Sequence, residues 1–352
     1  MTGNSFGKLF KITTWGESHG LAVGVIIDGC PSGLELTILD IRKELDKRRP
    51  GQSNIVTARN EADKVEIVSG LFENKTTGTP ISLIIKNKDV DSSKYESIKN
   101  LFRPGHADYT YWKKYSLRDY RGGGRSSGRE TVGRVAAGAI AKKILGIENI
   151  KIYGYTKQIG NIKVERIDLT EIEKNNVRCP NKNIANEMEN LILKIKEEDD
   201  SIGGIVEIVI KGCPAGLGDP VFNKLDADLA KALMSIGAVK GVEFGRGFEV
   251  AMLRGSENND QMTSDGFRTN NAGGILGGIS TGQDIIIKIA IKPTPSISKE
   301  QDTIDINNKN SKIKIEGRHD PCIVPRLIPV AESMIALVLV DKLLIQRKSS
   351  ND

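Results

Sequence analysis

The sequence predicts a mixed α+β fold made of two similar halves, and three observations lead to this prediction. The segment 23–34 matches the segment 206–217 in residue type at nearly every position, and each runs into a Gly-Cys-Pro-x-Gly-Leu turn. Apolar residues at helical spacing follow each turn. Elsewhere, strands and helices do not alternate regularly enough for a doubly wound parallel sheet. We therefore expect layers packed around one core, with the character of a sandwich.

The two copies of the repeat span roughly 23–49 and 206–236. In each copy an apolar or alternating stretch predicts a strand, which the Gly and Pro residues of the turn end. The helical apolar positions that follow are Ile38, Ile41 and Leu45 in the first copy and Leu225, Leu229 and Leu233 in the second. Two copies are too few for a solenoid. We expect them to form two halves of a single domain that spans residues 1–352.

The remaining elements follow from the same patterns. Strands are predicted at 64–68, 81–86, 203–211 and 284–291. Ser127 and Glu130 predict a capping box that opens a helix, which Gly146 ends. The apolar stripe of that helix consists of Val132, Val135, Ala136, Ala139 and Ile140. The polar region 161–200 contains a further helical pattern, and a last helix is predicted from Pro329 to Gln346.

Composition limits the function classes. The chain has 352 residues, a net charge of +6, 38% apolar and 27% charged residues, which is typical of a soluble globular protein. Its modest positive charge suits an enzyme of anionic small molecules or a nucleic-acid binder, although aromatic residues make up only 5%. The four cysteines lie far apart, as expected for buried thiols in a reducing compartment. No apolar run suits a signal peptide or a membrane span, so we expect a cytoplasmic protein.

The stretch 121–131, Arg-Gly-Gly-Gly-Arg-Ser-Ser-Gly-Arg-Glu-Thr, carries the strongest functional signal. Its glycines free the backbone to turn N–H groups inward, and it leads into a helix whose N-terminus favours negative charge. Three arginines so close together would repel one another, which favours a bound anion over a tight surface turn. The stretch has neither the Gly-Lys-Ser/Thr ending of a Walker loop nor the G-x-G-x-x-G spacing of a Rossmann fingerprint.

The three histidines, His19, His106 and His319, all lie in loops that contain Gly or Pro and a charged neighbour. Histidine changes charge near neutral pH, so we expect at least two of them to transfer protons or to hydrogen-bond an anion. The alternative is a structural, hydrogen-bonding histidine in each turn. Their spacing predicts no zinc or other metal site, and no G-x-S-x-G elbow supports a Ser–His–Asp hydrolase.

Three further stretches bear on the site. The segment 270–282 is rich in glycine and can present bare backbone to a flat ligand, or can pack as close backbone crossings. The segment 292–297, Lys-Pro-Thr-Pro-Ser-Ile, places a cation and two hydroxyls on a stiff turn that suits a phosphate. Basic residues at 47–49 end the first-repeat helix, where they also suit the helix dipole.

Together these motifs closely resemble the chorismate synthase family, and the resemblance extends from Gly7 to the final helix. Its landmarks, in order, are Trp-Gly-Glu-Ser-His-Gly at 15–20, Arg-Arg-Pro-Gly at 48–51, Arg-Pro-Gly-His at 103–106, the loop 121–127, Asn-Ala-Gly-Gly-Ile-Leu-Gly-Gly at 271–278, Lys-Pro-Thr at 292–294 and Gly-Arg-His-Asp-Pro-Cys at 317–322. Any one of these would be weak, whereas seven in order are highly specific. The resemblance implies the β-α-β sandwich peculiar to that family, assembled as a homotetramer.

The activity implied by the resemblance is that of a lyase. It is the anti-1,4-elimination of phosphate and a ring proton from 5-enolpyruvylshikimate 3-phosphate, which gives chorismate in the last step of the shikimate pathway of aromatic amino acid biosynthesis. Reduced FMN would be required without net redox change. The resemblance also associates NADP with the activity. The length of the chain leaves no obvious room for a reductase domain, so we expect an external source of reduced flavin.

The resemblance also implies roles for single residues. His19 would donate a hydrogen bond near the leaving phosphate, His106 would lie near the flavin N1/O2 edge, and Asp320 would take the proton from flavin N5. The implied flavin-binding residues are Arg125, Ser126, Ser127, Gly237, Ala238, Gly278, Lys292, Pro293, Thr294, Pro295, Ser296 and Arg318. The implied substrate-binding residues are Arg48, Arg49 and Arg129. Asn54 and Pro295 replace residues common in the family, an arginine and a serine.

Two alternatives stay open on the sequence alone. Another flavin- or nucleotide-binding enzyme would share the Gly/Arg loops but need not combine all three histidine motifs. A nucleic-acid-binding protein would show a steep salt dependence of affinity and indifference to FMN. We expect neither nucleic acid nor a membrane as a partner.

Overall fold

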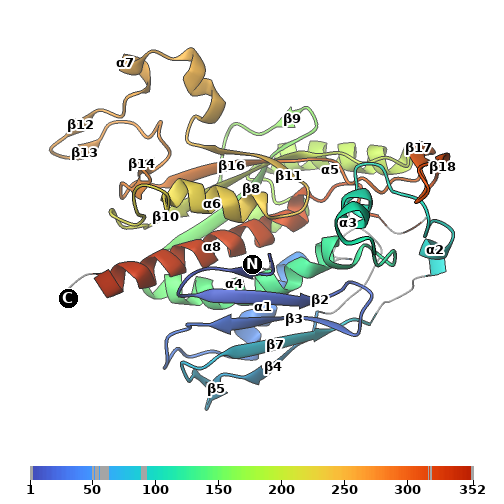
Figure 1. Ribbon diagram of the computed structural model, residues 1–352. Helices are drawn as coiled ribbons and strands as arrows, with labels where there is room; N and C mark the ends of the chain where they lie inside the picture. The colour runs from blue at the N-terminus through green and yellow to red at the C-terminus, as the bar shows by residue number, and fades with distance from the viewer. Residues whose placement is uncertain are drawn as a thin grey trace.

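The computed structural model describes residues 3–49, 51, 55, 63–88, 93–315, 317 and 319–349. It consists of two five-stranded antiparallel sheets with helices packed between them (Figure 1). The mixed α+β prediction is therefore confirmed, as is the expectation that the sheets are not parallel. No helix among the described residues is long and apolar enough to cross a membrane.

The first sheet has the strand order β1-β2-β3-β7-β4 and the second β11-β16-β10-β8-β9. The strands of the first sheet are β1 Ser5–Phe6, β2 Lys11–Gly16, β3 Ala22–Asp28, β4 Val65–Ser69 and β7 Ile81–Lys86. Those of the second are β8 Lys151–Ile159, β9 Ile162–Lys163, β10 Gly204–Lys211, β11 Val239–Phe244 and β16 Ile285–Ile291. The four strands predicted from the sequence are present within one residue of their expected bounds.

The central helices are α1 Ile38–Arg48, α4 Thr131–Ile147, α6 Leu225–Met234 and α8 Val324–Ser349. Helix α4 packs on β2, β3 and β7 of the first sheet, α8 packs on β8 and β10 of the second, and the two helices pack on each other. Gly138 of α4 permits this contact, because a β-carbon there would lie 2.3 Å from Cβ of Ser333 in α8. A glycine inside a helix is costly, and here it allows two helices to approach closely.

Peripheral elements surround these layers. The hairpins are β5 Leu71–Phe72 with β6 Lys75–Thr76, β12 Met262–Thr263 with β13 Gly266–Phe267, β14 Ile275–Leu276 with β15 Ile279–Ser280 and β17 Gln301–Ile304 with β18 Asn310–Ile313. The peripheral helices are α2 Ser93–Glu96, α3 Asp108–Tyr115, α5 Lys182–Glu197 and α7 Gly255–Asn258. The 3₁₀ turns are η1 Gly124–Ser126, η2 Gly128–Glu130, η3 Leu169–Lys174 and η4 Gly247–Met252. Helix α5 confirms the helical pattern read in the polar region 161–200.

The two predicted halves are visible in the sheet topology. The strand order β2-β3-β7-β4 of the first half corresponds to β8-β10-β16-β11 of the second. In each half a long helix comes after these four strands in the chain, α4 in the first half and α8 in the second. Buried residues of β3 pair with buried residues of β7 just as those of β10 pair with β16. The matching pairs are Val23–Ile85, Val25–Leu83 and Ile27–Ile81 in the first sheet and Val206–Ile289, Ile208–Ile287 and Ile210–Ile285 in the second.

The repeat extends to single hydrogen bonds in the two Gly-Cys-Pro-x-Gly-Leu turns. The Thr76 hydroxyl donates to the Pro31 carbonyl at 2.6 Å and accepts from the Leu34 amide at 3.0 Å. In the second half, the Ser280 hydroxyl donates to the Pro214 carbonyl at 2.6 Å and accepts from the Leu217 amide at 2.9 Å. In each half, therefore, a hydroxyl from a neighbouring hairpin hydrogen-bonds the same two main-chain groups of the turn, the proline carbonyl and the leucine amide.

Two predicted helix starts need correction. Ser127 caps the short turn η2 by accepting from the Arg129 amide at 3.3 Å. Glu130 does not complete a capping box, because its carboxylate accepts from Thr14 and Arg134 instead. Helix α8 begins at Val324 and not at Pro329, which lies inside the helix. Proline is tolerated in the first turn of a helix, which is why Pro329 suggested a start, but the helix already includes the residues from Val324 onwards.

Candidate active site

The candidate active site lies where the two long central helices begin. Arg129 precedes α4 and Arg326 belongs to the first turn of α8, and a short chain of contacts joins them. Arg129 and Arg48 both bind Asp63, and the main-chain oxygen of Arg48 accepts from Arg326. Both helices therefore direct their N-termini towards one region, which favours negative charge there.

The glycine-rich loop 121–127 packs against two of the three histidines. Gly122 and Gly123 have φ angles of +65° and +96°, in the left-handed region that favours glycine. A β-carbon on Gly122 would lie 2.8 Å from Cε1 of His19, and one on Gly123 would lie 3.0 Å from Cε1 of His106. The loop thus brings together histidines that are far apart in the chain, and only glycine leaves room for both.

The three arginines of the stretch 121–131 are each held by other groups of the protein, which corrects the argument for an anion drawn from their proximity. Arg121 pairs with Asp119 at 2.9 Å, and Arg129 binds Asp63. The guanidinium of Arg125 is directed onto β2, where it donates to the Thr14 hydroxyl at 2.8 Å and to main-chain oxygens. The side chains diverge, and each finds acceptors in the protein. Arg125 therefore fixes the loop to the first sheet.

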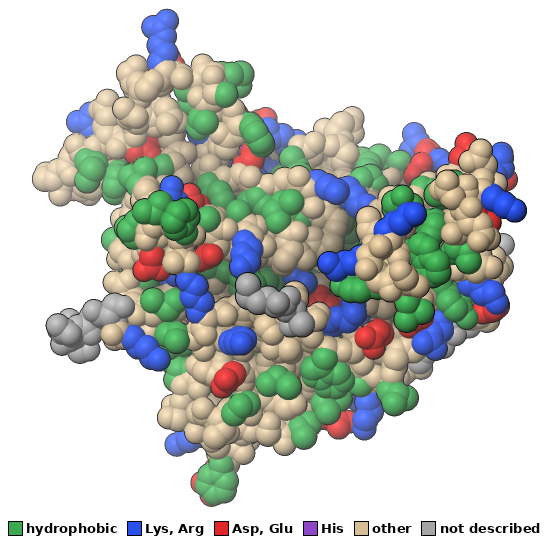
Figure 2. Space-filling view, in the orientation of Figure 1, with side chains coloured by type: hydrophobic (Ala, Val, Ile, Leu, Met, Phe, Trp, Pro, Cys, Tyr) green, Lys and Arg blue, Asp and Glu red, His purple; other side chains and the backbone are tan. Residues whose placement is uncertain are grey.

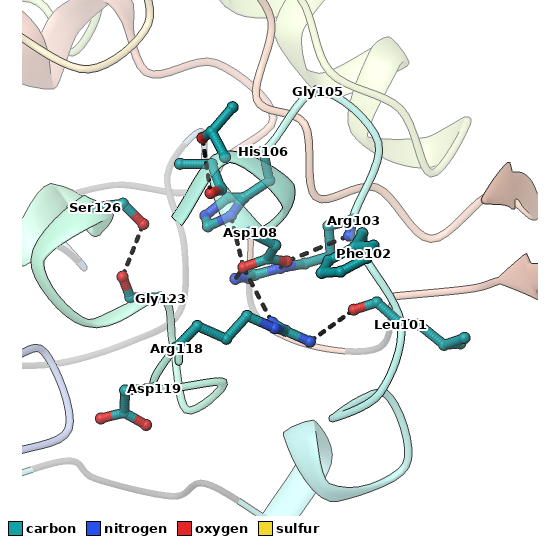
Figure 3. Close-up of polar contacts among 12 residues, drawn as sticks. Leu101, Phe102, Arg103, Gly105, His106, Asp108, Arg118, Asp119, Gly123 and Ser126 are labelled. Carbon is teal, nitrogen blue, oxygen red and sulfur yellow. Dashed lines mark hydrogen bonds and ion pairs between the residues drawn. The ribbon is translucent and has the colours of Figure 1, made fainter. Parts of the chain in front are cut away.

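His106 is bound to a buried carboxylate (Figure 3). Its Nδ1 lies 3.0 Å from Oδ1 of Asp108. Oδ1 also accepts from Nη2 of Arg103 at 2.9 Å and lies 3.2 Å from Nη1 of Arg118, while Oδ2 accepts from Nε of Arg103 at 2.7 Å. Burial would raise the pKa of Asp108, but hydrogen bonds from Arg103 and His106 hold this pKa well below its usual range. Burial lowers the pKa of His106 below 6.5, and the hydrogen bond to Asp108 opposes this only in part.

The turn 292–296 packs against the loop that carries His106. The Lys292 ammonium donates to the Gly105 carbonyl, and a β-carbon on Gly105 would lie 3.4 Å from Cβ of Pro295. The Lys292 amide donates to the Ala238 carbonyl at 2.9 Å. The Thr294 hydroxyl is buried and has no hydrogen-bond partner among the described residues. Burial and the charge of Lys240 lower the pKa of Lys292, as expected for a cation held near other cations.

Arg48 and Arg129 form the second basic part of the site. Both are buried and share Asp63, with Arg48 Nη1 at 3.4 Å, and Arg129 Nε also donates to Asn87 Oδ1 at 2.9 Å. Asn87 in turn donates to the carbonyls of the turn that contains His19, at Glu17 and Gly20. This network ties the basic pair to the His19 turn.

Arg49 is not part of this pair. Its side chain is 44% exposed and lies 3.6 Å from Asp46 one turn back on the same helix. Arg48 points inward and Arg49 does not, because consecutive positions on a helix face different directions.

Asp320 reaches the site through Arg326. The Arg326 guanidinium binds the Asp320 carboxylate with Nη1 and the Arg48 carbonyl with Nε at 3.3 Å. His319 lies beside Asp320, whereas the described contacts bring His19 and His106 to the glycine loop. Arg318 and Asn54 lie outside the described residues.

The remaining predicted flavin-binding residues do not all lie close together. The Ser126 hydroxyl donates to the Gly123 carbonyl at 2.7 Å, inside the loop. Gly237 and Ala238 follow the end of α6, next to Lys292. Gly278 lies at the other end of α6, where its carbonyl accepts from the Leu225 amide at 2.8 Å. A ten-residue helix is about 15 Å long, so Gly278 does not share the immediate surroundings of Ala238.

Sequence reasoning assigned no role to several carboxylate, amide and guanidinium groups that organise the site. They are Asp63, Asn87, Arg103, Asp108, Arg118 and Arg326. The signal for Asp108 was its position at a helix start two residues after His106, just beyond the recognised motif 103–106. Asp63, Asn87 and Arg326 offered no such signal, because each contacts its partners across long stretches of sequence.

Among the described contacts of the site, cations outnumber carboxylates. The contacts above join the cations Arg48, Arg103, Arg118, Arg129, Lys292 and Arg326 with the carboxylates Asp63, Asp108 and Asp320. Figure 2 shows several Lys and Arg side chains close together near α3 on one face of the molecule. No group of three or more His, Cys, Asp or Glu side chains within the described ranges is arranged to hold a metal ion. The arrangement suits an anion with more than one negative charge.

Comparison with known proteins agrees with this geometry. The family model for chorismate synthase matches residues 10–344. A chorismate synthase of Methanosarcina mazei is 57% identical over 98% of this chain and 97% of its own length, and one of Chloroflexus aggregans is 54% identical over 99% and 97%. A crystal structure of chorismate synthase superposes with a TM-score of 0.78 and 31% identity, covering 97% of this chain and 93% of that one.

The fold match agrees with the β-α-β sandwich expected from the motifs, and the relatives are matched over nearly their full length. The family consists of lyases that release phosphate. Since the family model and close relatives cover almost the whole chain, this chain belongs to the chorismate synthase family.

Proposed function

We propose that the protein catalyses the anti-1,4-elimination of phosphate and a ring proton from 5-enolpyruvylshikimate 3-phosphate, giving chorismate in the last step of the shikimate pathway. The observation that carries this proposal is the convergence of the His19 turn and the His106 loop on the glycine loop, with the Lys292 turn packed against the His106 loop. The substrate carries two carboxylates and a phosphate, and the surplus of cations in the site suits this charge.

The residues present fit a bound reduced FMN. The hydroxyls of Thr294 and Ser18 are buried without a partner among the described residues, so each is free to bind a polar ligand atom. Gly122 and Gly123 place backbone without a side chain directly beside the two histidines. When bound, reduced FMN would supply electron density to the ring that loses phosphate. The residues that would hold it are Lys292, Thr294 and Ser126, together with Gly237, Ala238, Pro293, Pro295, Ser296, Ser127 and Arg318. Gly278 would be reached only by a ligand that extends along α6.

The chain's own groups would then act on the substrate. His19 would donate a hydrogen bond to the departing phosphate at the N-terminal end of α4, where the helix dipole adds to the stabilisation. Arg48 and Arg129 would bind a substrate anion, since both are buried beside Asp63 near the N-termini of α4 and α8, where negative charge is favoured. Asp320 would accept a proton at a carboxylate oxygen, and Arg326 would fix the position of that carboxylate.

We further propose that the protein is a single domain that assembles as a homotetramer in the cytoplasm. The segment around η4, α7 and β12 projects from the second sheet (Figure 1), and it exposes Phe248 and Met252 by 80% and 82%. Large exposed apolar side chains of this kind suit contact with a second copy. Reduced flavin would come from another protein, to which any requirement for NADP would belong.

The first test is anaerobic incubation with 5-enolpyruvylshikimate 3-phosphate and dithionite-reduced FMN, following phosphate release and chorismate absorbance. Both products should appear with reduced flavin and neither with oxidised flavin. A folded, flavin-binding protein that forms neither product would overturn the substrate assignment. The Asp320→Asn variant should bind FMN as before but turn over roughly 100-fold more slowly or worse. Unchanged turnover in that variant would exclude Asp320 as the base.

A further inference from the structure

We propose that Tyr95 is a positioning residue for His19, because its aromatic ring packs on the imidazole and fixes the direction in which His19 meets a ligand anion. The inference rests on the proposed function for the role of His19. Tyr95 belongs to α2, a single helical turn that precedes the 103–106 loop in the chain. It lies in none of the motifs that carry the family resemblance.

The His19 ring contacts groups from two other parts of the chain. The centroids of the Tyr95 and His19 rings are 5.4 Å apart, with an interplanar angle of 59°, and this separation and tilt favour aromatic pairing. A β-carbon on Gly122 would lie 2.8 Å from Cε1 of His19 and 3.0 Å from its Nδ1. Gly122 leaves room for the imidazole, whereas Tyr95 supplies a surface against which the imidazole can be held.

The main chain of the His19 turn is fixed separately. Nδ2 of Asn87 donates to the carbonyls of Glu17 and Gly20 at 3.0 and 2.8 Å. These bonds hold the backbone on both sides of His19, but they do not restrict the rotation of its side chain. A ring packed on the imidazole does restrict that rotation, so the contact with Tyr95 adds an orientation that the turn alone does not supply.

Tyr95 is itself held by two parts of the site. The Arg103 Cζ atom lies 5.8 Å from the centroid of the Tyr95 ring, close enough for a cation–π attraction. The neighbouring residue Glu96 accepts a hydrogen bond from the Tyr120 hydroxyl at 2.7 Å, and Tyr120 directly precedes the glycine loop. Contacts from both loops that form the site therefore set the position of the Tyr95 ring.

The contacts with His19 and Arg103 are made by the ring of Tyr95, so the ring and not the hydroxyl should carry its role. Arg103 keeps its bonds from Nε and Nη2 to Asp108, at 2.7 and 2.9 Å, when the ring is removed. The loss of orientation should therefore fall on His19. A displacement of about 1 Å in a group that contacts the reacting atoms can cost about 100-fold in rate.

Steady-state kinetics of Tyr95→Leu and Tyr95→Phe test this assignment. Tyr95→Leu should lower kcat roughly 10- to 100-fold with little change in KM, because Arg48 and Arg129 would still bind the substrate. Tyr95→Phe keeps the ring and should retain kcat within about twofold. Full turnover in Tyr95→Leu would overturn the proposal. A loss in Tyr95→Phe as large as in Tyr95→Leu would also overturn it, because the hydroxyl would then be the active group.

Tyr115→Leu is the matched control. The ring of Tyr115 also pairs with a second ring, that of Tyr111 at 5.7 Å, and also has a cation over it, the Lys114 ammonium at 5.5 Å. Among the described contacts it touches neither His19 nor His106. Its substitution should leave kcat unchanged, and thermal unfolding should show that Tyr95→Leu is folded. If Tyr95→Leu did not fold, a low kcat in Tyr95→Phe would still overturn the proposal.

A second measurement needs no turnover. The chain has only three histidines, so the NMR spectrum of protein labelled with ¹³C at histidine Cε1 is simple, and His19→Gln assigns the resonance of His19. Inorganic phosphate is the probe and should move this resonance in the natural protein. In Tyr95→Leu the resonance should start from a different position, since the aromatic ring is gone, and the Kd for phosphate should rise about two- to tenfold. Tyr95→Phe should match the natural protein.

An unchanged His19 resonance and an unchanged phosphate Kd in Tyr95→Leu would overturn the proposal. So would a His19 resonance that phosphate does not move in the natural protein, because the ring would then meet no anion. Failure of the proposed function is distinguishable, because the spectra need neither substrate nor flavin. The expected spectra from a protein inactive on 5-enolpyruvylshikimate 3-phosphate would retain the role of Tyr95 and remove the substrate.

Discussion

Nε of Arg326 donates to the main-chain oxygen of Arg48 at 3.3 Å, although the two residues lie 278 positions apart. The same guanidinium binds Asp320 through Nη1. Arg326 therefore connects the basic pair on Asp63 with the carboxylate proposed as the base. This single side chain links two groups that, in the proposed function, face the same substrate.

The first prediction concerns this connection. Arg326→Met should lower kcat by about 100-fold, because a small displacement of Asp320 is costly to proton transfer. Arg326→Lys should lose less, since it keeps the charge but not both hydrogen-bond directions. Arg347→Met is the control on the same helix, as its side chain is 54% exposed and pairs with Glu148. Anaerobic steady-state kinetics measure kcat for each variant. Full turnover in Arg326→Met would contradict the role of Arg326 in positioning Asp320.

The second prediction concerns the glycine loop. Gly123→Ala should weaken FMN binding at least about tenfold, because its φ of +96° is strained for alanine and its β-carbon would displace His106. Gly128→Ala in the same stretch should leave binding unchanged, since a β-carbon there meets nothing within 4 Å. Titration of flavin fluorescence measures both variants. Equal affinities in the two would show that the loop does not border the flavin.

The third prediction uses the internal repeat as its own control. Lys143 pairs with Asp40 between α4 and α1 at 2.8 Å, and Lys342 pairs with Asp228 between α8 and α6 at 2.9 Å. Lys342 is 3% exposed and also binds Asp219 and the Asn223 carbonyl, whereas Lys143 is 32% exposed.

Lys342→Met should therefore reduce the free energy of unfolding by about 2–3 kcal/mol, since it removes a buried ammonium that binds two carboxylates and a carbonyl. Lys143→Met should reduce it by less than about 1 kcal/mol. Urea unfolding at pH 7 compares the two variants. A larger loss in Lys143→Met would mean that burial does not set the strength of these pairs.

The fourth prediction concerns acid stability. Burial would raise the pKa of Glu44, but the charges of Lys142 and Lys47 and their hydrogen bonds lower it from 4.5 to about 2. A group whose pKa is lower in the folded state stabilises the fold above its unfolded pKa, and the stabilisation is lost as pH falls from about 4.5 towards 2.

Glu44→Gln removes the titrating group. The difference in urea midpoint between the natural protein and this variant should be largest near neutral pH and should shrink as the pH falls below about 4.5. Unfolding curves at several pH values between 7 and 3.5 give the result. A difference that grows on acidification would reverse the sign of the shift and refute the pairing of Glu44 with Lys142.

The sequence predicted the local elements well, because their patterns repeat within a few residues. The apolar spacing of α1, α4 and α5 and the alternation of β7 and β16 depend only on neighbouring positions. It was less accurate at helix starts. Glu130 has the type and spacing of a capping residue, but Thr14 and Arg134 from other elements bind its carboxylate instead.

The sequence identified only part of the candidate site. Gly122, Gly123, His19 and His106 stand in motifs whose residue types carry chemical meaning on their own. The arginines of the loop did not reveal their roles, because each takes acceptors from a different part of the fold, as Arg125 does from β2. An isolated aspartate such as Asp63 is indistinguishable from a surface carboxylate until its two arginines are placed beside it.

The sequence by itself determined the two halves, the glycine turns that admit the histidines, and the family to which the motifs belong. These properties depend on residue type and short spacing, which a linear pattern records. Only the tertiary structure decided which charge faces which: Arg326 against Arg48 and Asp320, and Asp108 against His106, Arg103 and Arg118. Ion pairing and burial act through space, so they are fixed only when the packing of α4 and α8 between the sheets brings distant segments together.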